Sequence, residues 1–114
     1  MNKYNIKYSE TFYEDLIEIL KHIKYNLDNE IASEKLYIEI INKIKDRARN
    51  PLDFEKYISC ISKRVFYKIY VKNYTIFYMV ENNEMQVKRV LNNRRNFKYY
   101  IKESNEKYTI KQGS

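Results

Sequence analysis

The chain has 114 residues with one cysteine, one histidine and one glycine, and its length fits a single domain with its own core. These counts exclude a disulfide within the chain, a Cys/His zinc site, a glycine-rich phosphate loop and a dinucleotide-binding fingerprint, and we expect no cofactor. The net charge is +7. Residues 1–57 carry 10 Lys/Arg and 11 Asp/Glu, whereas residues 58–114 carry 12 Lys/Arg and 4 Asp/Glu. The basic second half favours a polyanion or an acidic protein as partner.

The first predicted elements are a short strand over 4–8 and a helix over about 10–25. The strand is indicated by alternation with period two. Ser9 and Thr11 both offer an N-cap for the helix, and Thr11 with Glu14 makes a possible capping box. Apolar side chains then recur at helical spacing, namely Phe12, Leu16, Ile19, Leu20, Ile23 and Leu27. Acidic residues early and lysines late complement the helix dipole.

A second helix is predicted over about 29–49, after a tight connection at 26–29. Its apolar stripe consists of Ala32, Leu36, Ile40, Ile41, Ile44 and Ala48. The helix ends in a basic stretch and is stopped at Asn50-Pro51, because proline cannot continue a helix. Two helices joined by so few residues must pack as an antiparallel hairpin.

The remainder of the domain reads as strands. Residues 52–63 are ambiguous, and we interpret them as a loop with a turn of helix. From Arg64 onward apolar and polar residues alternate, which predicts strands over about 64–71, 74–80 and 85–91. Turns at Lys72-Asn73 and Asn82-Asn83 would join the three strands into an antiparallel meander.

Together the elements predict an α+β fold of two layers, with an N-terminal strand, a helical hairpin and a three-stranded meander. The apolar face of the sheet should bury the hairpin. We expect one domain over 1–101 and a polar tail over 102–114. No apolar run approaches the ~20 residues that a membrane helix needs, and the first residues lack the apolar core of a signal peptide. A cytoplasmic protein without a membrane partner is therefore expected.

Several segments, taken in order, carry a family resemblance: "YNIKYSETFYEDLIEILKHI", "IASEKLYIEIINKI", "FYKIYVKNYTIFYMV" and "VKRVLNNRRNFKYYI". The set resembles the RelE/ParE superfamily of toxins from bacterial type II toxin–antitoxin systems, over about residues 3–101. The resemblance implies a compact toxin with a β-α-α-β-β-β layout. It also implies a cognate antitoxin, encoded beside the toxin, that wraps the toxin and masks its basic surface.

The superfamily divides by target, and this division leaves three hypotheses for function. RelE-like members cleave mRNA in the ribosomal A site, and ParE-like members poison DNA gyrase. We favour a ribosome-dependent mRNA endoribonuclease that needs no metal, with a gyrase inhibitor without nuclease activity as the alternative. The third hypothesis is a basic binding module with no toxicity.

Cleavage through the ribose 2′-OH requires groups that orient the hydroxyl, stabilise the charged transition state and protonate the leaving oxygen. Arg94 and Arg95 are the candidates for charge stabilisation, because a guanidinium binds phosphate oxygens in pairs and stays charged. Lys68 is a candidate on a neighbouring strand. Tyr99 or Tyr100 could stack on a base or donate a proton, as the late tyrosine of RelE-like nucleases does. The alternatives are a solvated turn for the arginines and packing for the tyrosines.

Further basic residues are candidates for gripping an RNA backbone, namely Lys43, Lys45, Arg47, Arg49 and Arg89. We expect the end of the last strand and the basic end of the second helix to form one positively charged edge. Two departures weaken the nuclease interpretation: Thr75 stands where RelE-like nucleases tend to carry an arginine, and the one histidine, His22, lies in the first helix. Cys60 is expected to be an inert buried thiol, and the acidic set at 14–18 to serve capping and charge balance.

Overall fold

The computed structural model describes residues 4–58 and 63–94. In chain order the elements are β1 (Asn5–Tyr8), α1 (Glu10–Lys21), a π-helical turn η1 (His22–Asn26), α2 (Glu30–Arg47), β2 (Lys56–Ile58), β3 (Val65–Val71), β4 (Tyr74–Glu81) and β5 (Glu84–Asn92). Cys60, Arg95, Tyr99, Tyr100 and the predicted tail at 102–114 lie outside the described residues.

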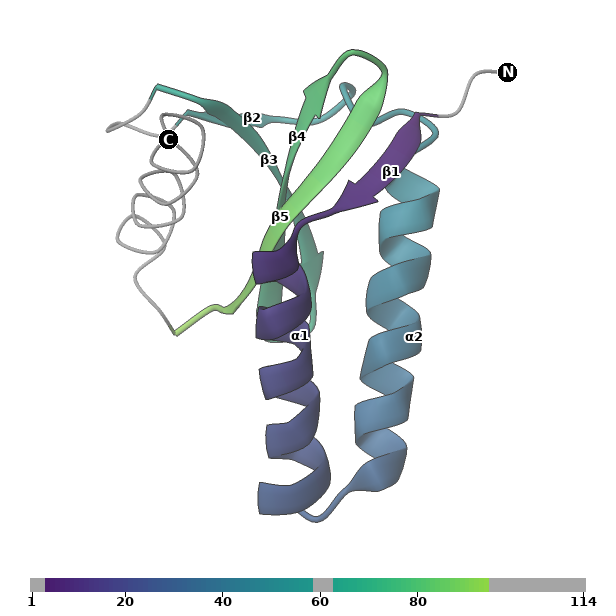
Figure 1. Cartoon of the computed structure of the whole chain (residues 1–114), viewed down its shortest axis with the longest axis vertical. Helices are drawn as coiled ribbons and strands as arrows, with labels where there is room; N and C mark the ends of the chain where they lie inside the picture. Colours follow the sequence, from purple (N-terminus) through teal and green to yellow (C-terminus); the bar gives the residue numbers. More distant parts are fainter. Residues whose placement is uncertain (1–3, 59–62, 95–114) are drawn as a thin grey trace.

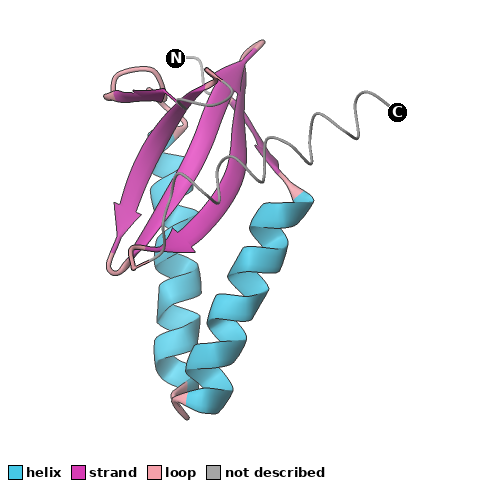
Figure 2. Ribbon diagram, turned by 90° about the vertical axis from the view of Figure 1, so that its left-hand side faces the viewer, coloured by secondary structure: helices cyan, strands magenta, loops and turns pink. Residues whose placement is uncertain are grey.

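The strands form one five-stranded sheet in the order β1-β5-β4-β3-β2. The antiparallel meander β3-β4-β5 is confirmed, and so is the α+β class. β1 pairs in parallel with β5, through partners such as Tyr8 and Val87, so the sheet as a whole is mixed. The helical hairpin packs on one face of this sheet and extends past its end, which gives the two expected layers (Figures 1 and 2).

The interpretation of 52–63 as a loop with a turn of helix was wrong over its middle part. There the structure has the edge strand β2, in which Tyr57 pairs with Phe66 of β3. The ring of Tyr57 also lies 6.0 Å from that of Phe77, centroid to centroid. Three residues are too few to show a period, so this strand is determined by its neighbours in space and not by local pattern.

Both helices begin at side-chain caps. Ser9, and not Thr11, caps α1, since its hydroxyl oxygen accepts a hydrogen bond from the Phe12 N–H at 3.0 Å. Asn29 caps α2 by accepting from the Ala32 N–H at 3.0 Å. At the end of α1 the helix widens into η1, where the Leu27 N–H reaches back to the His22 carbonyl at 3.1 Å. These caps and the widened turn confirm the hairpin and define its length.

The main core lies between the hairpin and the sheet. Its buried residues are Phe12, Leu16, Ile23, Leu36, Ile40, Ile44, Ala48, Tyr67, Ile69, Val71, Ile76, Tyr78, Met85, Val87 and Val90. A smaller apolar cluster, Phe66, Phe77 and Leu91, lies on the opposite face of the sheet. The side chains of β3 thus divide between the two faces of the sheet, with Tyr67, Ile69 and Val71 toward the helices.

The end of α2 is fixed to the sheet by a small polar network. Arg47 Nη1 donates to the Lys68 carbonyl and to the Tyr78 hydroxyl oxygen, both at 3.0 Å. The Tyr78 hydroxyl in turn donates to the Pro51 carbonyl at 2.7 Å. Burial raises the pKa of Tyr78, so the phenol remains a protonated donor at neutral pH. The Arg47 guanidinium also stacks 3.4 Å from the centroid of the Phe54 ring.

We expect Tyr78→Phe to lower the free energy of unfolding by about 1–3 kcal/mol, because it leaves the buried Pro51 carbonyl without its donor. Urea denaturation followed by circular dichroism measures this change. Tyr70→Phe is the matched control, since the Tyr70 side chain is 63% exposed on the adjacent strand, and it should change stability by less than about 0.5 kcal/mol. Equal effects of the two substitutions would contradict the role assigned to the network.

Candidate functional site

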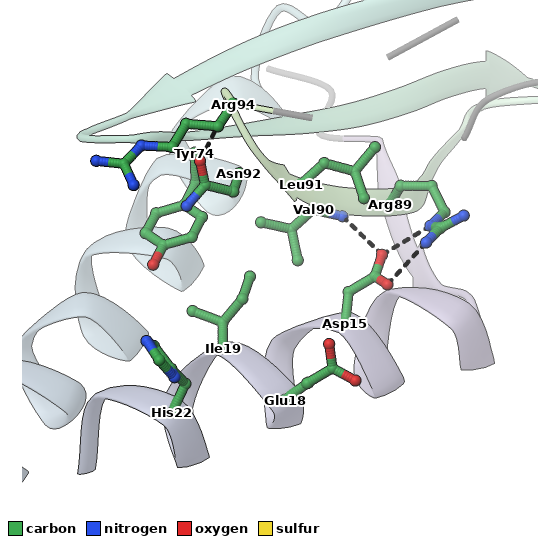
Figure 3. A pocket seen from close by; sticks show the side chains of 10 residues that line it. All are labelled: Asp15, Glu18, Ile19, His22, Tyr74, Arg89, Val90, Leu91, Asn92 and Arg94. Carbon is green, nitrogen blue, oxygen red and sulfur yellow. Dashed lines mark hydrogen bonds and ion pairs between the residues drawn. The ribbon is translucent and has the colours of Figure 1, made fainter. Parts of the chain in front are cut away.

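A cleft of about 410 Å³ lies between α1 and the last part of β5 (Figure 3). We call it the α1–β5 cleft. Its lining residues are Asp15, Glu18, Ile19, His22, Tyr74, Arg89, Val90, Leu91, Asn92 and Arg94. They come from α1, the first residue of η1, the start of β4 and the end of β5, with Arg94 two residues beyond the last residue of β5. The cleft therefore joins a helix to a strand that lies more than 70 residues later in the chain.

The cleft exists because β1 is shorter than β5. β1 pairs with β5 only over Glu84–Val87, so the rest of β5 has α1 beside it and no strand on that edge. The turn into α1 covers part of this edge: the Ser9 N–H donates to the Val87 carbonyl at 3.0 Å and the Ser9 hydroxyl to the Lys88 carbonyl at 2.8 Å. Tyr78 of β4 pairs with Val87 and Phe77 pairs with Arg89, so β5 has one extra residue at this point. This irregularity changes the face of the sheet to which the following side chains of β5 point.

An ion pair between Asp15 and Arg89 closes one end of the cleft. Arg89 Nε lies 2.7 Å from Asp15 Oδ2, and Arg89 Nη2 lies 2.9 Å from Oδ1. The same carboxylate accepts from the Val90 N–H at 3.2 Å, so it also satisfies a backbone donor on the edge of β5. The two side chains are only 14% and 11% exposed. A paired, bidentate contact of this kind is strong, and it compensates the charges of Asp15 and Arg89 at this end of the cleft.

The other end of the cleft carries hydrogen-bond donors, and the cation among them is not paired with a carboxylate of the described residues. Arg94 is exposed, and within residues 4–58 and 63–94 its guanidinium has no ion-pair partner; its backbone N–H donates to Asn92 Oδ1 at 2.9 Å. Tyr74 lines the cleft beside it, and His22 lines the cleft from the α1 side, beyond the Tyr74 ring (Figure 3). Burial raises the pKa of Tyr74, which keeps its hydroxyl protonated and able to donate at neutral pH. Glu18 is an exposed acid on the α1 side of the cleft.

Lys68 lies on the face of the sheet away from the hairpin. Its Nζ is 4.4 Å from the centroid of the Tyr57 ring and 6.0 Å from that of Phe77. Arg64 and Lys88 lie near each other in the same region, and burial together with the Arg64 charge lowers the pKa of Lys88. Arg64 Nη1 also contacts the sulfur of Met79, a residue of the far-face cluster, at 4.0 Å.

The structure does not bring Lys68 and Arg94 together. Lys68 is in register with Phe77, and Phe77 with Arg89, so two strand spacings separate Lys68 from β5. Arg94 then lies five residues further along, which places the two Cα atoms roughly 20 Å apart. Lys68 contacts the far-face aromatic residues, whereas Arg94 lines a cleft on the α1 side.

The expectation of one positive edge was wrong. The end of α2 lies where the Tyr4 N–H bonds to the Ala48 carbonyl and the Asn5 N–H to the Asn83 carbonyl. Arg94 follows Asn93, whose N–H bonds to Asn73 at the other end of β4. The length of β4, eight residues, separates the two ends by roughly 25 Å. Lys43, Lys45 and Arg49 are exposed near the end of α2, whereas Arg47 turns into the fold.

Arg89 was predicted to bind RNA, but its guanidinium is engaged with Asp15. The acidic set at 14–18 was assigned to capping and charge balance, and this assignment missed the role of Asp15. A signal was present in the sequence: Asp15 stands three residues after Phe12 and four before Ile19, inside the apolar stripe of the helix. A carboxylate in such a stripe requires a cation or several donors, because burying an unpaired charge is costly.

Comparison with known proteins identifies the family to which this chain belongs. The family described as "ParE toxin of type II toxin-antitoxin system, parDE" matches residues 6–97. The chain belongs to this ParE toxin family. As a member of a type II toxin family, it fits the first two hypotheses and not a binding module without toxicity. No curated protein matches the chain closely enough to count as a relative.

Two solved structures share the fold. One is the chromosomal ParDE toxin–antitoxin system from P. aeruginosa, with a TM-score of 0.66, 15% sequence identity and coverage of 79% of this chain and 96% of that chain. The other is the toxin–antitoxin complex RelBE2 from Mycobacterium tuberculosis, with a TM-score of 0.53, 14% identity and coverage of 81% and 93%. At these identities the likeness concerns the fold. Neither helix in the described part of the ParE-family chain is apolar enough over its length to cross a membrane.

We expect Asp15→Asn to lower the free energy of unfolding by about 3 kcal/mol, because it leaves the Arg89 charge buried without its counter-ion. Guanidinium or urea titration measures the loss. Glu14→Gln is the control, since Glu14 is the exposed preceding residue, and it should remain within about 0.5 kcal/mol of the wild type. A stability of Asp15→Asn indistinguishable from that of Glu14→Gln would refute the role of the ion pair.

Proposed function

We propose that this ParE-family toxin is held inactive by a cognate antitoxin and, once released, arrests growth by binding DNA gyrase and not by cutting mRNA. Its family match is to the ParE toxins, and the two solved structures described above are toxin–antitoxin complexes or systems. The resemblance to ParE-like members implies gyrase as the target. The geometry of the described residues supports this choice over the nuclease.

The observation that carries the choice is the separation of Lys68 from Arg94. Metal-independent cleavage of RNA needs its acid, base and charge-stabilising groups within hydrogen-bond reach of one phosphate. These are the two predicted catalytic residues that the structure describes, and they lie on different sides of the sheet, roughly 20 Å apart along the strand register. This separation supports a toxin that does not use the pair on one phosphate.

Three further residues support a toxin that acts by binding. The guanidinium groups of Arg47 and Arg89 are held by Tyr78, a carbonyl and Asp15 within the fold. Thr75 stands at the position where RelE-like nucleases tend to carry an arginine, and it is fully buried. Its hydroxyl donates to Asn93 Oδ1 at 2.6 Å, so it stabilises the turn after β5 and offers no positive charge.

The proposal predicts that the purified toxin inhibits DNA supercoiling by purified gyrase and leaves a defined message intact on translating ribosomes. Supercoiling is measured on relaxed plasmid, and message integrity by primer extension. Lys68→Gln should still arrest growth, because no cleavage step depends on its charge. Message cut between codon bases, together with loss of arrest in a folded Lys68→Gln variant, would return the assignment to the nuclease.

A further inference from the structure

We propose that the α1–β5 cleft receives an acidic segment of the antitoxin, with one carboxylate bound at the Arg94 end. This inference rests on the antitoxin part of the proposed function and is independent of the gyrase part. The two ends of the cleft differ, because Arg89 at one end is paired with Asp15 and Arg94 at the other has no acidic partner among the described residues. This difference limits which ligands fit and in which orientation.

The two arginines of the cleft show this difference. Arg89 is held in a bidentate contact with Asp15, with both side chains largely buried. Arg94 is exposed, and its guanidinium has no acidic partner among the residues that the structure describes. Tyr74 lies beside Arg94 and offers an O–H donor (Figure 3). A carboxylate placed there would meet a permanent cation and a phenol donor together.

The floor of the cleft favours a peptide side chain over an inorganic anion. Ile19, Val90 and Leu91 supply apolar surface between the two polar ends. A space of about 410 Å³ is larger than a single carboxylate requires, so neighbouring apolar atoms of the ligand would be buried as well. The Val90 N–H faces α1, and strand alternation therefore turns the backbone of Asn92 toward the same side. Backbone groups on this edge suit an extended segment.

Glu18 argues against a nucleic acid as the occupant of the cleft. It lines the cleft, and its charge would repel a chain of phosphates, whereas the charge of Asp15 is already compensated by Arg89. A single carboxylate can lie at the Arg94 end without approaching either acid. The toxin carries a net charge of +7, so an acidic protein partner gains from the overall field as well as from this local contact.

The test uses the full-length toxin and the small protein encoded beside its gene, taken as the antitoxin, in isothermal titration calorimetry. Arg94→Gln should weaken binding at least about tenfold, because a charge-assisted hydrogen bond is lost. Arg49→Gln is the matched control: Arg49 is also exposed, lies outside the cleft, and its loss should change the affinity less than about twofold. Circular dichroism confirms that each variant is folded.

A second pair of variants tests the sign of the effect. Glu18→Gln removes an acid from the cleft and should tighten binding, whereas Glu14→Gln, an exposed acid one turn earlier on α1, should not. The carboxylate is then located on the antitoxin by replacing each Asp and Glu with its amide, and separately by amidating its C-terminus. The carboxylate that binds Arg94 is identified by comparing affinities for two toxins. Its removal weakens binding to the wild-type toxin but does not weaken binding to the Arg94→Gln toxin further.

The outcomes separate the two proposals. Binding by the wild type with equal losses in Arg94→Gln and Arg49→Gln, or with no loss in either, would overturn the cleft assignment and leave the toxin–antitoxin relationship intact. No binding by the wild type would overturn that relationship itself. Because neither gyrase nor ribosomes are present in the titration, the result does not depend on which of them the toxin attacks.

Discussion

The contact of one carboxylate with one guanidinium and one backbone N–H determines how the two layers of this toxin meet at their open edge. β5 extends beyond β1, and an unpaired strand edge is prone to pair with other chains. Asp15 places its carboxylate against that edge, and Arg89 neutralises it. The helix thus replaces a missing strand, and the space left between α1 and β5 becomes the α1–β5 cleft.

The same edge explains why the positive charge of the chain is dispersed. Antiparallel strands send consecutive segments to alternate ends of the sheet, so Arg94 and the end of α2 are kept apart by the length of β4. Lys68, Arg64 and Lys88 lie in a third region, on the far side. A basic composition is therefore compatible with several small recognition sites and need not produce one continuous surface for a polyanion.

Local periodicity predicted the elements that are long enough to show a period: both helices, the meander and its turns at Lys72-Asn73 and Asn82-Asn83. It failed where a structure depends on distant partners. β2 has three residues and owes its existence to β3, and the parallel pairing of β1 with β5 connects segments near the two ends of the described chain. Asp15 and Arg89 are 74 positions apart, so neither residue reveals its partner in a sequence window.

Within the site, the sequence identified Arg94 as a candidate for stabilising negative charge, but it did not show which residues of α1 and β4 would line the same cleft. Residue type alone made Arg89 and Arg94 equivalent, because both are permanent cations near the end of one strand. A single acid on α1 distinguishes them, since it binds Arg89 and lies at the opposite end of the cleft from Arg94 (Figure 3). The cleft therefore has one compensated arginine and one arginine available to a ligand, and a ligand with one negative charge would bind with that charge at the Arg94 end. Specificity of this kind comes from the placement of one unpaired charge and not from the total charge of the protein.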